Sequence, residues 1–220
     1  MCLKRNPKTP SLPAMKPEEL ALLKQHFPEA AVTIVGAMYE QRRFVLKFNR
    51  PRNSKLGDFC PPRTPTSICH ITLNCDLNPY QMLITYVHEV AHYDVYQQYK
   101  PKRPQPHGTE WQTQFATLLR PFMTESIFPK DVLEALEKHL QHIKASSTAD
   151  HNLQRVLKQY DKRIEGVCTL ESLPDGARFV LKNGLVFQKG EKQRTRYRCF
   201  CISNGRWYFV SALAEVKQLQ

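Results

Sequence analysis

The chain has 220 residues, 41% of them hydrophobic, which suffices for one large domain or for a main domain with a smaller one. Its 32 Lys and Arg residues outnumber its 20 Asp and Glu residues, and the formal net charge of +12 favours phosphate-bearing or otherwise acidic partners. The sequence shows no secretory signal, no membrane span of ~20 apolar residues and no cysteine spacing typical of a disulfide framework. We therefore expect a soluble, cytoplasmic protein with reduced thiols and no membrane partner.

The first part of the chain predicts two helices and two strands. Residues 1–16 form a Pro- and Lys-rich lead that we expect to be flexible. Pro17-Glu18-Glu19 and Pro28-Glu29 each predict a helix start, because proline suits the first turn and carboxylates stabilise the positive end of the helix dipole. Apolar residues alternate from Phe44 to Phe48 and again from Cys69 to Cys75, with a Pro-rich connection between them, so we expect two paired, half-buried strands.

Three further helices are predicted in the middle of the chain. Asn78-Pro79 has the composition of a helix cap and first turn, and apolar residues then continue at helical spacing to Val95. A second helix is predicted from Gly108-Thr109-Glu110, with Trp111 on its buried face. A third is predicted from Phe128-Pro129-Lys130-Asp131.

The first of these three helices carries the sequence His88-Glu89-Val90-Ala91-His92. Histidines four residues apart lie on one face of a helix, where both can offer a neutral nitrogen to Zn²⁺. A glutamate directly after the first histidine reaches the open coordination position without binding the metal. Two such histidines alone are more often partly buried helix residues than ligands, but Glu89 in this position favours a catalytic zinc site.

A catalytic zinc takes three protein ligands and keeps a fourth position for water or substrate, so one more ligand is needed. His107 is the best candidate, because the glycine after it permits a tight turn and the following helix mounts it rigidly. The alternative interpretation of His107 is a loop histidine in a basic, Pro-rich segment. Glu110 is a competing ligand, since some zinc peptidases use a carboxylate from a second helix.

These motifs together resemble the SprT-like metallopeptidases, the family of bacterial SprT and of the eukaryotic DNA–protein crosslink protease Spartan. The resemblance covers roughly residues 17–145 and includes the histidine motif, Asn78-Pro79, Lys55-Leu56-Gly57-Asp58, His70-Ile71-Thr72-Leu73-Asn74 and His107-Gly108-Thr109-Glu110-Trp111. It implies an α+β, zincin-like domain with His88, His92 and His107 as zinc ligands and Glu89 as the catalytic acid and base. It also implies action on DNA-associated or DNA-crosslinked proteins.

Residues 146–166 predict a linker with a short helix, which would separate the SprT-like domain over 17–145 from a small basic β module over 167–220. The linker signal is the run Ala145-Ser146-Ser147-Thr148. The β module is indicated by short alternating runs separated by turn pairs such as Asn183-Gly184 and Asn204-Gly205.

Two cysteines of the tail depart from the family pattern. Many SprT-like proteins end in a zinc ribbon with paired Cys-x-x-Cys elements, whereas this chain has Cys199-Phe200-Cys201 accompanied by Cys168 alone. These residues cannot complete a four-ligand site by themselves. We therefore interpret Cys199 and Cys201 as inward-facing strand residues rather than as a second metal site.

A zinc ion in the predicted site would lower the pKa of a bound water from 15.7 toward about 7, and Glu89 would take its proton and return it to the leaving amine. The expected reaction is hydrolysis of a peptide bond in a protein or peptide substrate. We expect the strand over 71–75 to align an extended peptide beside the cleft through main-chain hydrogen bonds.

Basic residues gather in two segments. The first supplies Arg42, Arg43, Arg50, Arg52 and Lys55. In the second, Arg194, Arg196 and Arg198 occupy alternate positions of a predicted strand, with Lys189, Lys192 and Arg206 nearby. We expect backbone-directed, salt-sensitive binding to single-stranded or branched DNA, and the alternative interpretation is two solvated charged faces.

The competing hypothesis is a non-catalytic nucleic-acid-binding or regulatory protein in which zinc only holds the helices together. Glu89 argues against it, because a structural zinc site normally closes its fourth position with another protein ligand. The sequence indicates no particular partner subunit.

Overall fold

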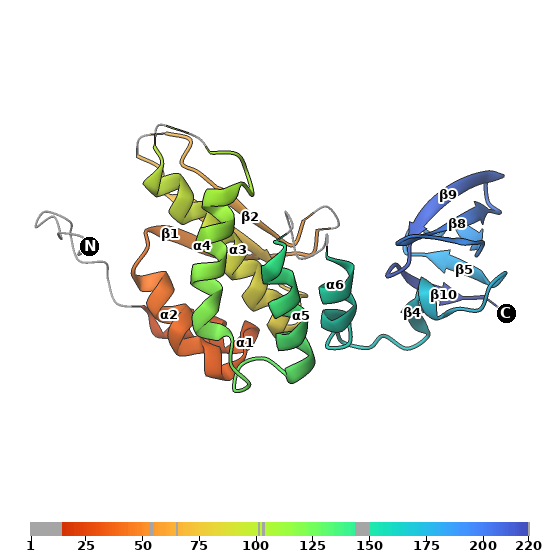
Figure 1. Cartoon of the computed structure of the whole chain (residues 1–220), viewed down its shortest axis with the longest axis horizontal. Coiled ribbons are helices and arrows are strands. Elements are labelled where there is room, and N and C mark those ends of the chain that lie inside the picture. Colours follow the sequence, from red (N-terminus) through yellow and green to blue (C-terminus); the bar gives the residue numbers. More distant parts are fainter. Residues whose placement is uncertain are drawn as a thin grey trace, which may run out of the picture. The chain divides into compact units, whose positions relative to one another are not determined.

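The computed structural model describes residues 15–52, 55–64, 66–100, 102, 104–143 and 150–219. Nearly all of the predicted N-terminal lead and the whole run Ala145–Thr148 lie outside the described residues. The chain divides into two compact units, Met1–Asp161 and Lys162–Gln220 (Figure 1). Its helices and two sheets confirm the α+β class. Within the described ranges, no helix is both long enough and apolar enough to cross a membrane.

The first unit combines helices with a small sheet. In chain order, its described elements are α1 (Pro17–His26), a short 3-10 turn (Glu29–Ala31), α2 (Val32–Glu40), β1 (Phe44–Asn49), β2 (Gly57–Cys60), β3 (Cys69–Asn74), α3 (Pro79–Gln98), α4 (Thr109–Leu119), a second 3-10 turn (Arg120–Phe122), α5 (Lys130–Gln141) and α6 (His151–Lys158). The predicted helices and the two predicted strands of this region are therefore present.

The sheet of the first unit has the strand order β1-β3-β2. β1 runs parallel to β3, with Phe44 opposite Cys69, so the predicted pairing is confirmed. β2 runs antiparallel to β3, with Gly57 opposite Leu73. β3 is thus the central strand and has no free edge on which to align a peptide, which corrects the role predicted for residues 71–75. β2 is an edge strand, and it packs against α3.

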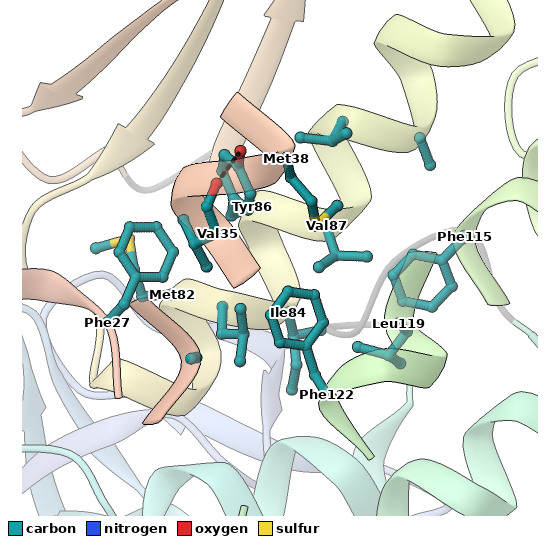
Figure 2. Close-up of a cluster of buried hydrophobic side chains, with 14 of the residues drawn as sticks. Phe27, Val35, Met38, Met82, Ile84, Tyr86, Val87, Phe115, Leu119 and Phe122 are labelled. Carbon is teal, nitrogen blue, oxygen red and sulfur yellow. Dashed lines mark hydrogen bonds between the residues drawn. The ribbon is translucent and has the colours of Figure 1, made fainter. Parts of the chain in front are cut away.

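α3 is the central helix of the first unit. The side-chain oxygen of Asn78 accepts a hydrogen bond from the N–H of Gln81 at 2.9 Å, as expected for an N-cap residue. Tyr86 and Val87 are fully buried, and Figure 2 shows them in one cluster with side chains of α2 and α4 such as Val35 and Phe115. Burial of each large apolar side chain contributes about 1.5–3 kcal/mol. The helix that carries the histidine motif is therefore firmly fixed.

α6 falls within the stretch for which the sequence predicts a linker with a short helix. Its Leu153 and Leu157 are buried in the core of the first unit. The Nδ2 atom of Asn78 donates hydrogen bonds to the Leu157 carbonyl at 3.0 Å and to Asp161 at 2.7 Å. The compact first unit consequently extends to Asp161, because two buried leucines hold α6 in the core and hydrogen bonds of Asn78 link its end to the start of α3.

The second unit is an antiparallel sheet with the path β4-β10-β5-β6-β8-β7, and β9 pairs with β8. Its elements are β4 (Val167–Thr169), a 3-10 turn (Leu170–Ser172), β5 (Arg178–Leu181), β6 (Val186–Gln188), β7 (Lys192–Gln193), β8 (Arg196–Cys201), β9 (Arg206–Ser211) and β10 (Glu215–Gln218). Gly184 and Gly205 have φ angles of 81° and 70° in two of its turns, a left-handed conformation that glycine adopts without strain.

The carboxylate of Asp94 connects three segments of the first unit. It accepts hydrogen bonds from Arg42 Nε at 2.8 Å and Nη2 at 2.7 Å, and from Gln114 Nε2 at 2.8 Å. Arg42 follows α2, Asp94 lies in α3 and Gln114 lies in α4. The Arg42 and Asp94 side chains are only 13% and 18% exposed, so loss of one partner leaves the other charge desolvated and unpaired.

We expect Arg42→Ala to lower the free energy of unfolding by about 3 kcal/mol, because it leaves the largely desolvated Asp94 carboxylate without its cation. The neighbouring Arg43 is exposed, and Arg43→Ala is expected to change the free energy of unfolding by no more than about 0.5 kcal/mol. Urea denaturation of the two variants measures both values. Equal losses would contradict the role of this ion pair in joining the helices.

Candidate metal centre

Three histidine side chains meet at one point of the first unit. His88 and His92 lie one turn apart on α3, and their Nε2 atoms are 3.1 Å apart. His107 lies just before α4, and its Nε2 atom is 3.0 Å from that of His92 and 3.2 Å from that of His88. Among the described residues, these three form the group able to hold a metal ion. Glu110, the competing ligand, is exposed and lies outside this group.

The spacing of the three nitrogens fits a tetrahedral metal ion. Zinc binds histidine nitrogen at about 2.0–2.1 Å, so two ligands of a tetrahedral zinc lie about 3.3 Å apart. The observed separations of 3.0–3.2 Å are close to that value. A fourth direction is left without a protein ligand among the described residues, which is the arrangement of a site that also binds water or substrate.

The backbone at His107 adopts an unusual conformation. Its φ angle is 60°, in the left-handed region that costs a non-glycine residue about 1–2 kcal/mol. The sequence predicted that Gly108 makes the tight turn, but Gly108 is extended, with φ −69° and ψ −175°. A β-carbon on Gly108 would lie 3.1 Å from the Gln105 carbonyl oxygen, a tight contact that glycine avoids. His107 itself therefore makes the turn that directs its side chain toward α3.

Trp111 packs against all three histidines. The centroid of its ring is 4.6 Å from that of His88, 5.3 Å from that of His92 and 4.7 Å from that of His107. Trp111 is 1% exposed, and its indole N–H points to the His88 carbonyl at 3.4 Å. The sequence identified Trp111 only as a core residue. In the structure it also fixes the orientation of the imidazoles, and only its place in the motif after His107 could have indicated this.

All three histidines are held in the uncharged form at neutral pH. Burial, together with the neighbouring His92 and His107, lowers the pKa of His88 to about 2. Burial and His107 lower the pKa of His92 to about 4, and burial lowers the pKa of His107. Neutral imidazole is the form that binds metal ions, so few protons compete for these nitrogens near pH 7.

Glu89 is buried between α3 and β2. A β-carbon on Gly57 would lie 2.7 Å from Glu89 Oε1 and 2.7 Å from Thr85 Cγ2, closer than such atoms can approach. Only glycine therefore allows β2 to pass this close to the glutamate. The backbone of Phe59, also in β2, forms a hydrogen bond with the Glu89 carboxylate. The edge strand and the carboxylate are thus held together.

Burial raises the pKa of Glu89 to about 8, and the nearby negative charge of Asp58 adds to this rise. The hydrogen bond from the Phe59 backbone opposes it. The pKa of Asp58 moves in the other direction: burial raises it, but hydrogen bonds from Lys55 and Cys60 outweigh burial and leave it lowered. Two carboxyl groups beside the histidine cluster therefore have clearly separated proton affinities, as is common in catalytic sites.

Several basic residues predicted to bind nucleic acid are engaged within the first unit. Arg42 pairs with Asp94, and Arg52 Nε donates to Asn74 Oδ1 at 2.9 Å. Lys55 Nζ lies 2.6 Å from Asp58 Oδ2. Arg43 and Arg50 are exposed. The structure thus leaves this segment with fewer available cations than the sequence suggested.

The basic surface predicted for the second unit is partly present. Arg196 and Arg198 are exposed on β8, whereas Arg194 lies in the turn before β8 with a φ angle of 54°. Lys189, expected on this surface, is 4% exposed, and its ammonium group donates to the Leu173 carbonyl and lies 4.2 Å from the centre of the Tyr197 ring. Cys199 and Cys201 are free, fully buried strand residues, in agreement with their interpretation.

Comparison of the chain with protein families, with curated proteins and with solved structures finds no match in any of the three. The resemblance to SprT-like metallopeptidases therefore stays a prediction from the chain's own motifs. What the site does is therefore inferred from its residues and their geometry.

Proposed function

We propose that this chain is a zinc-dependent metallopeptidase of the SprT-like kind, with a zincin-like first unit. The observation that carries the proposal is the convergence of three uncharged imidazole nitrogens on the helix turn that also bears the buried Glu89. A set of three histidines with an open fourth position is typical of catalytic zinc. Glu89 is outside the ligand group, so it is available as a proton carrier.

The open position favours catalysis over the non-catalytic alternative. A zinc that only held helices together would normally have a fourth Cys or His ligand. In the described part of the chain, no further His, Cys, Asp or Glu joins His88, His92 and His107. A nucleic-acid-binding or regulatory protein with structural zinc is therefore the weaker hypothesis.

When bound, zinc would polarise the scissile carbonyl and lower the pKa of a water molecule toward about 7. Glu89 would take a proton from the attacking water and return a proton to the leaving amine. The burial that raises the pKa of Glu89 to about 8 strengthens it as a proton acceptor. Glu89 must be ionised to accept the proton of the water. A bound zinc ion nearby would favour this ionised form.

β2 is the element best placed to align a substrate. It is an edge strand of the sheet, and it touches Glu89 through Gly57 and Phe59. An extended peptide added to this edge would form main-chain hydrogen bonds with β2 and lie beside the general base. Main-chain recognition of this kind selects extended or unfolded segments of protein substrates.

Glu89→Gln tests the chemical step. We expect the variant to keep one zinc per chain, because the glutamate is not a ligand, and to lose at least about 100-fold in the rate of casein cleavage, because the proton acceptor is gone. Elemental analysis measures the zinc, and a gel-based assay with the zinc-loaded protein measures cleavage.

Glu110→Gln is the matched control, since Glu110 is a nearby exposed carboxylate outside the histidine cluster. It is expected to keep both zinc and activity. Cleavage by Glu89→Gln at the rate of the unaltered protein would contradict the proposed function.

We also propose that the second unit binds single-stranded nucleic acid, which would bring the peptidase to DNA-associated proteins. The supporting feature is an aromatic–arginine face on the β8–β9 hairpin, made of Arg196, Arg198, Phe200, Trp207 and Phe209. Arg198 lies opposite Phe209 in the strand register and Phe200 lies opposite Trp207, so these side chains share one face. Trp207 and Phe209 are each 55% exposed.

The contacts within this face suit unpaired bases. The Arg198 guanidinium lies 4.5 Å from the centre of the Trp207 ring, and Phe200 lies 5.3 Å from the same ring. Exposed aromatic rings offer stacking surfaces to bases, and the arginines between them offer cations to the phosphates. Duplex DNA keeps its bases stacked internally and would use only the arginines.

Trp207→Ala is expected to weaken binding of a fluorescent oligothymidylate about tenfold, as the loss of one base-stacking ring does. Trp207→Phe keeps a ring and should retain most of the affinity. Arg198→Ala should instead reduce the slope of log affinity against log salt concentration by about 1, the value for one lost phosphate contact. Fluorescence anisotropy over a salt series measures all three. An unchanged affinity in Trp207→Ala would exclude base stacking on this face.

A further inference from the structure

A cavity of about 680 Å³ opens beside the metal-ligand cluster. His92 and His107 both contribute to its wall, so the cavity is continuous with the point where the three histidine nitrogens meet. The rest of the wall comes from β2, from the last turns of α3, from the start of α4 and from the segment before His107. The cavity volume lies within the range of about 300–1,000 Å³ that is common for ligand pockets.

The wall of this cavity is mainly apolar and aromatic. Phe59, Val95, Tyr96 and Trp111 line it, and the rings of Phe59 and Tyr96 lie 5.5 Å apart. Pro104 and Pro106 add further apolar surface. An apolar guest gains free energy here by leaving water, because most of the groups that it meets are also apolar.

The charged groups of the wall are cationic. Lys100 and Lys102 line the cavity, and Lys100 Nζ lies 3.9 Å from the centre of the Tyr96 ring. No carboxylate is found among the described residues of the lining. A lysine or arginine side chain of a substrate would therefore lose its water without gaining a partner. Apolar side chains carry no such penalty.

We propose that this cavity, the Phe59–Val95–Tyr96–Trp111 pocket, selects a large apolar and preferably aromatic side chain at a residue flanking the scissile bond. The inference rests on the proposed peptidase function, since it places the scissile carbonyl at the histidine cluster. Successive Cα atoms of a peptide are about 3.8 Å apart, so the residues on either side of that carbonyl lie within reach of a pocket that the ligands themselves border. Main-chain hydrogen bonds with β2 do not distinguish one substrate side chain from another, so a pocket of this kind would determine the preference.

Selection from a library of short random peptides tests the pocket independently of catalysis. The bait is zinc-loaded Glu89→Gln protein, which is expected to bind peptides without cleaving them. We expect the bound peptides to be enriched in Phe, Tyr, Trp, Leu or Met at one position. Two peptides that differ only by Phe or Ala at this position should differ about 10- to 100-fold in affinity. Equal affinity for the two peptides would overturn the proposal.

Two substitutions locate the preference in the pocket. Val95→Phe partly fills the cavity and should lower the ratio of the affinities for the Phe peptide and the Ala peptide. Tyr96→Ala enlarges the cavity and should reduce the Phe-to-Ala ratio at least fivefold, which gives a second reading if the filled variant folds poorly. Tyr99→Ala is the matched control, a tyrosine of the same helix end that does not line the cavity, and it should leave the ratio unchanged.

The unaltered zinc-loaded protein then separates the two claims. Cleavage of the Phe peptide beside its Phe residue supports both the pocket and the peptidase function. Selective binding without any cleavage keeps the pocket and overturns the peptidase function. Cleavage that depends on Glu89 but shows no preference at either flanking residue keeps the peptidase and overturns the pocket.

Discussion

The meeting of three imidazole nitrogens within 3.2 Å of one another is the constraint on which the rest of the first unit depends. Neutral imidazoles with lone pairs directed to one point need a cation or a proton between them, and burial disfavours the proton. α3 supplies two of the nitrogens through its helical repeat alone. The third requires that α4 dock against α3, which the Asp94–Gln114 hydrogen bond and the ring of Trp111 ensure.

The same burial that stabilises the fold also sets the chemistry of the site. α3 is packed on nearly all sides, and this keeps His88 and His92 uncharged and raises the proton affinity of Glu89. β2 adds to this burial because Gly57 lets its backbone touch the glutamate. Stability and proposed function are therefore not separate in this unit: a looser helix would also be a weaker base and a weaker metal site.

Local patterns predicted much of this arrangement. The helix starts, the pairing of β1 with β3, the two neighbouring histidines on α3 and the turn glycines of the second unit all follow from spacing or from single-residue preferences. β2 was missed, because its four residues show no alternation and stand in a Pro-rich stretch. The turn at His107 was assigned to Gly108, because the sequence shows which residue tolerates a left-handed backbone but not which one adopts it.

Tertiary partners were the least predictable feature. Arg42 and Lys189 looked like surface cations, yet one is held by Asp94 and the other is buried over Tyr197. Conversely, the sequence analysis did not single out Trp207 and Phe209, which are exposed beside arginines. A charge run does not reveal which of its members have partners across the fold, and strand alternation does not tell which face is covered.

X-ray absorption spectroscopy at the zinc edge of the zinc-loaded protein tests the central claim most directly. The account predicts about three histidine nitrogens and one light oxygen ligand, all at about 2.0–2.1 Å, in a four-coordinate site. A sulfur shell at about 2.3 Å would instead place the metal on cysteines, and a spectrum without histidine scattering would show that His88, His92 and His107 do not hold it.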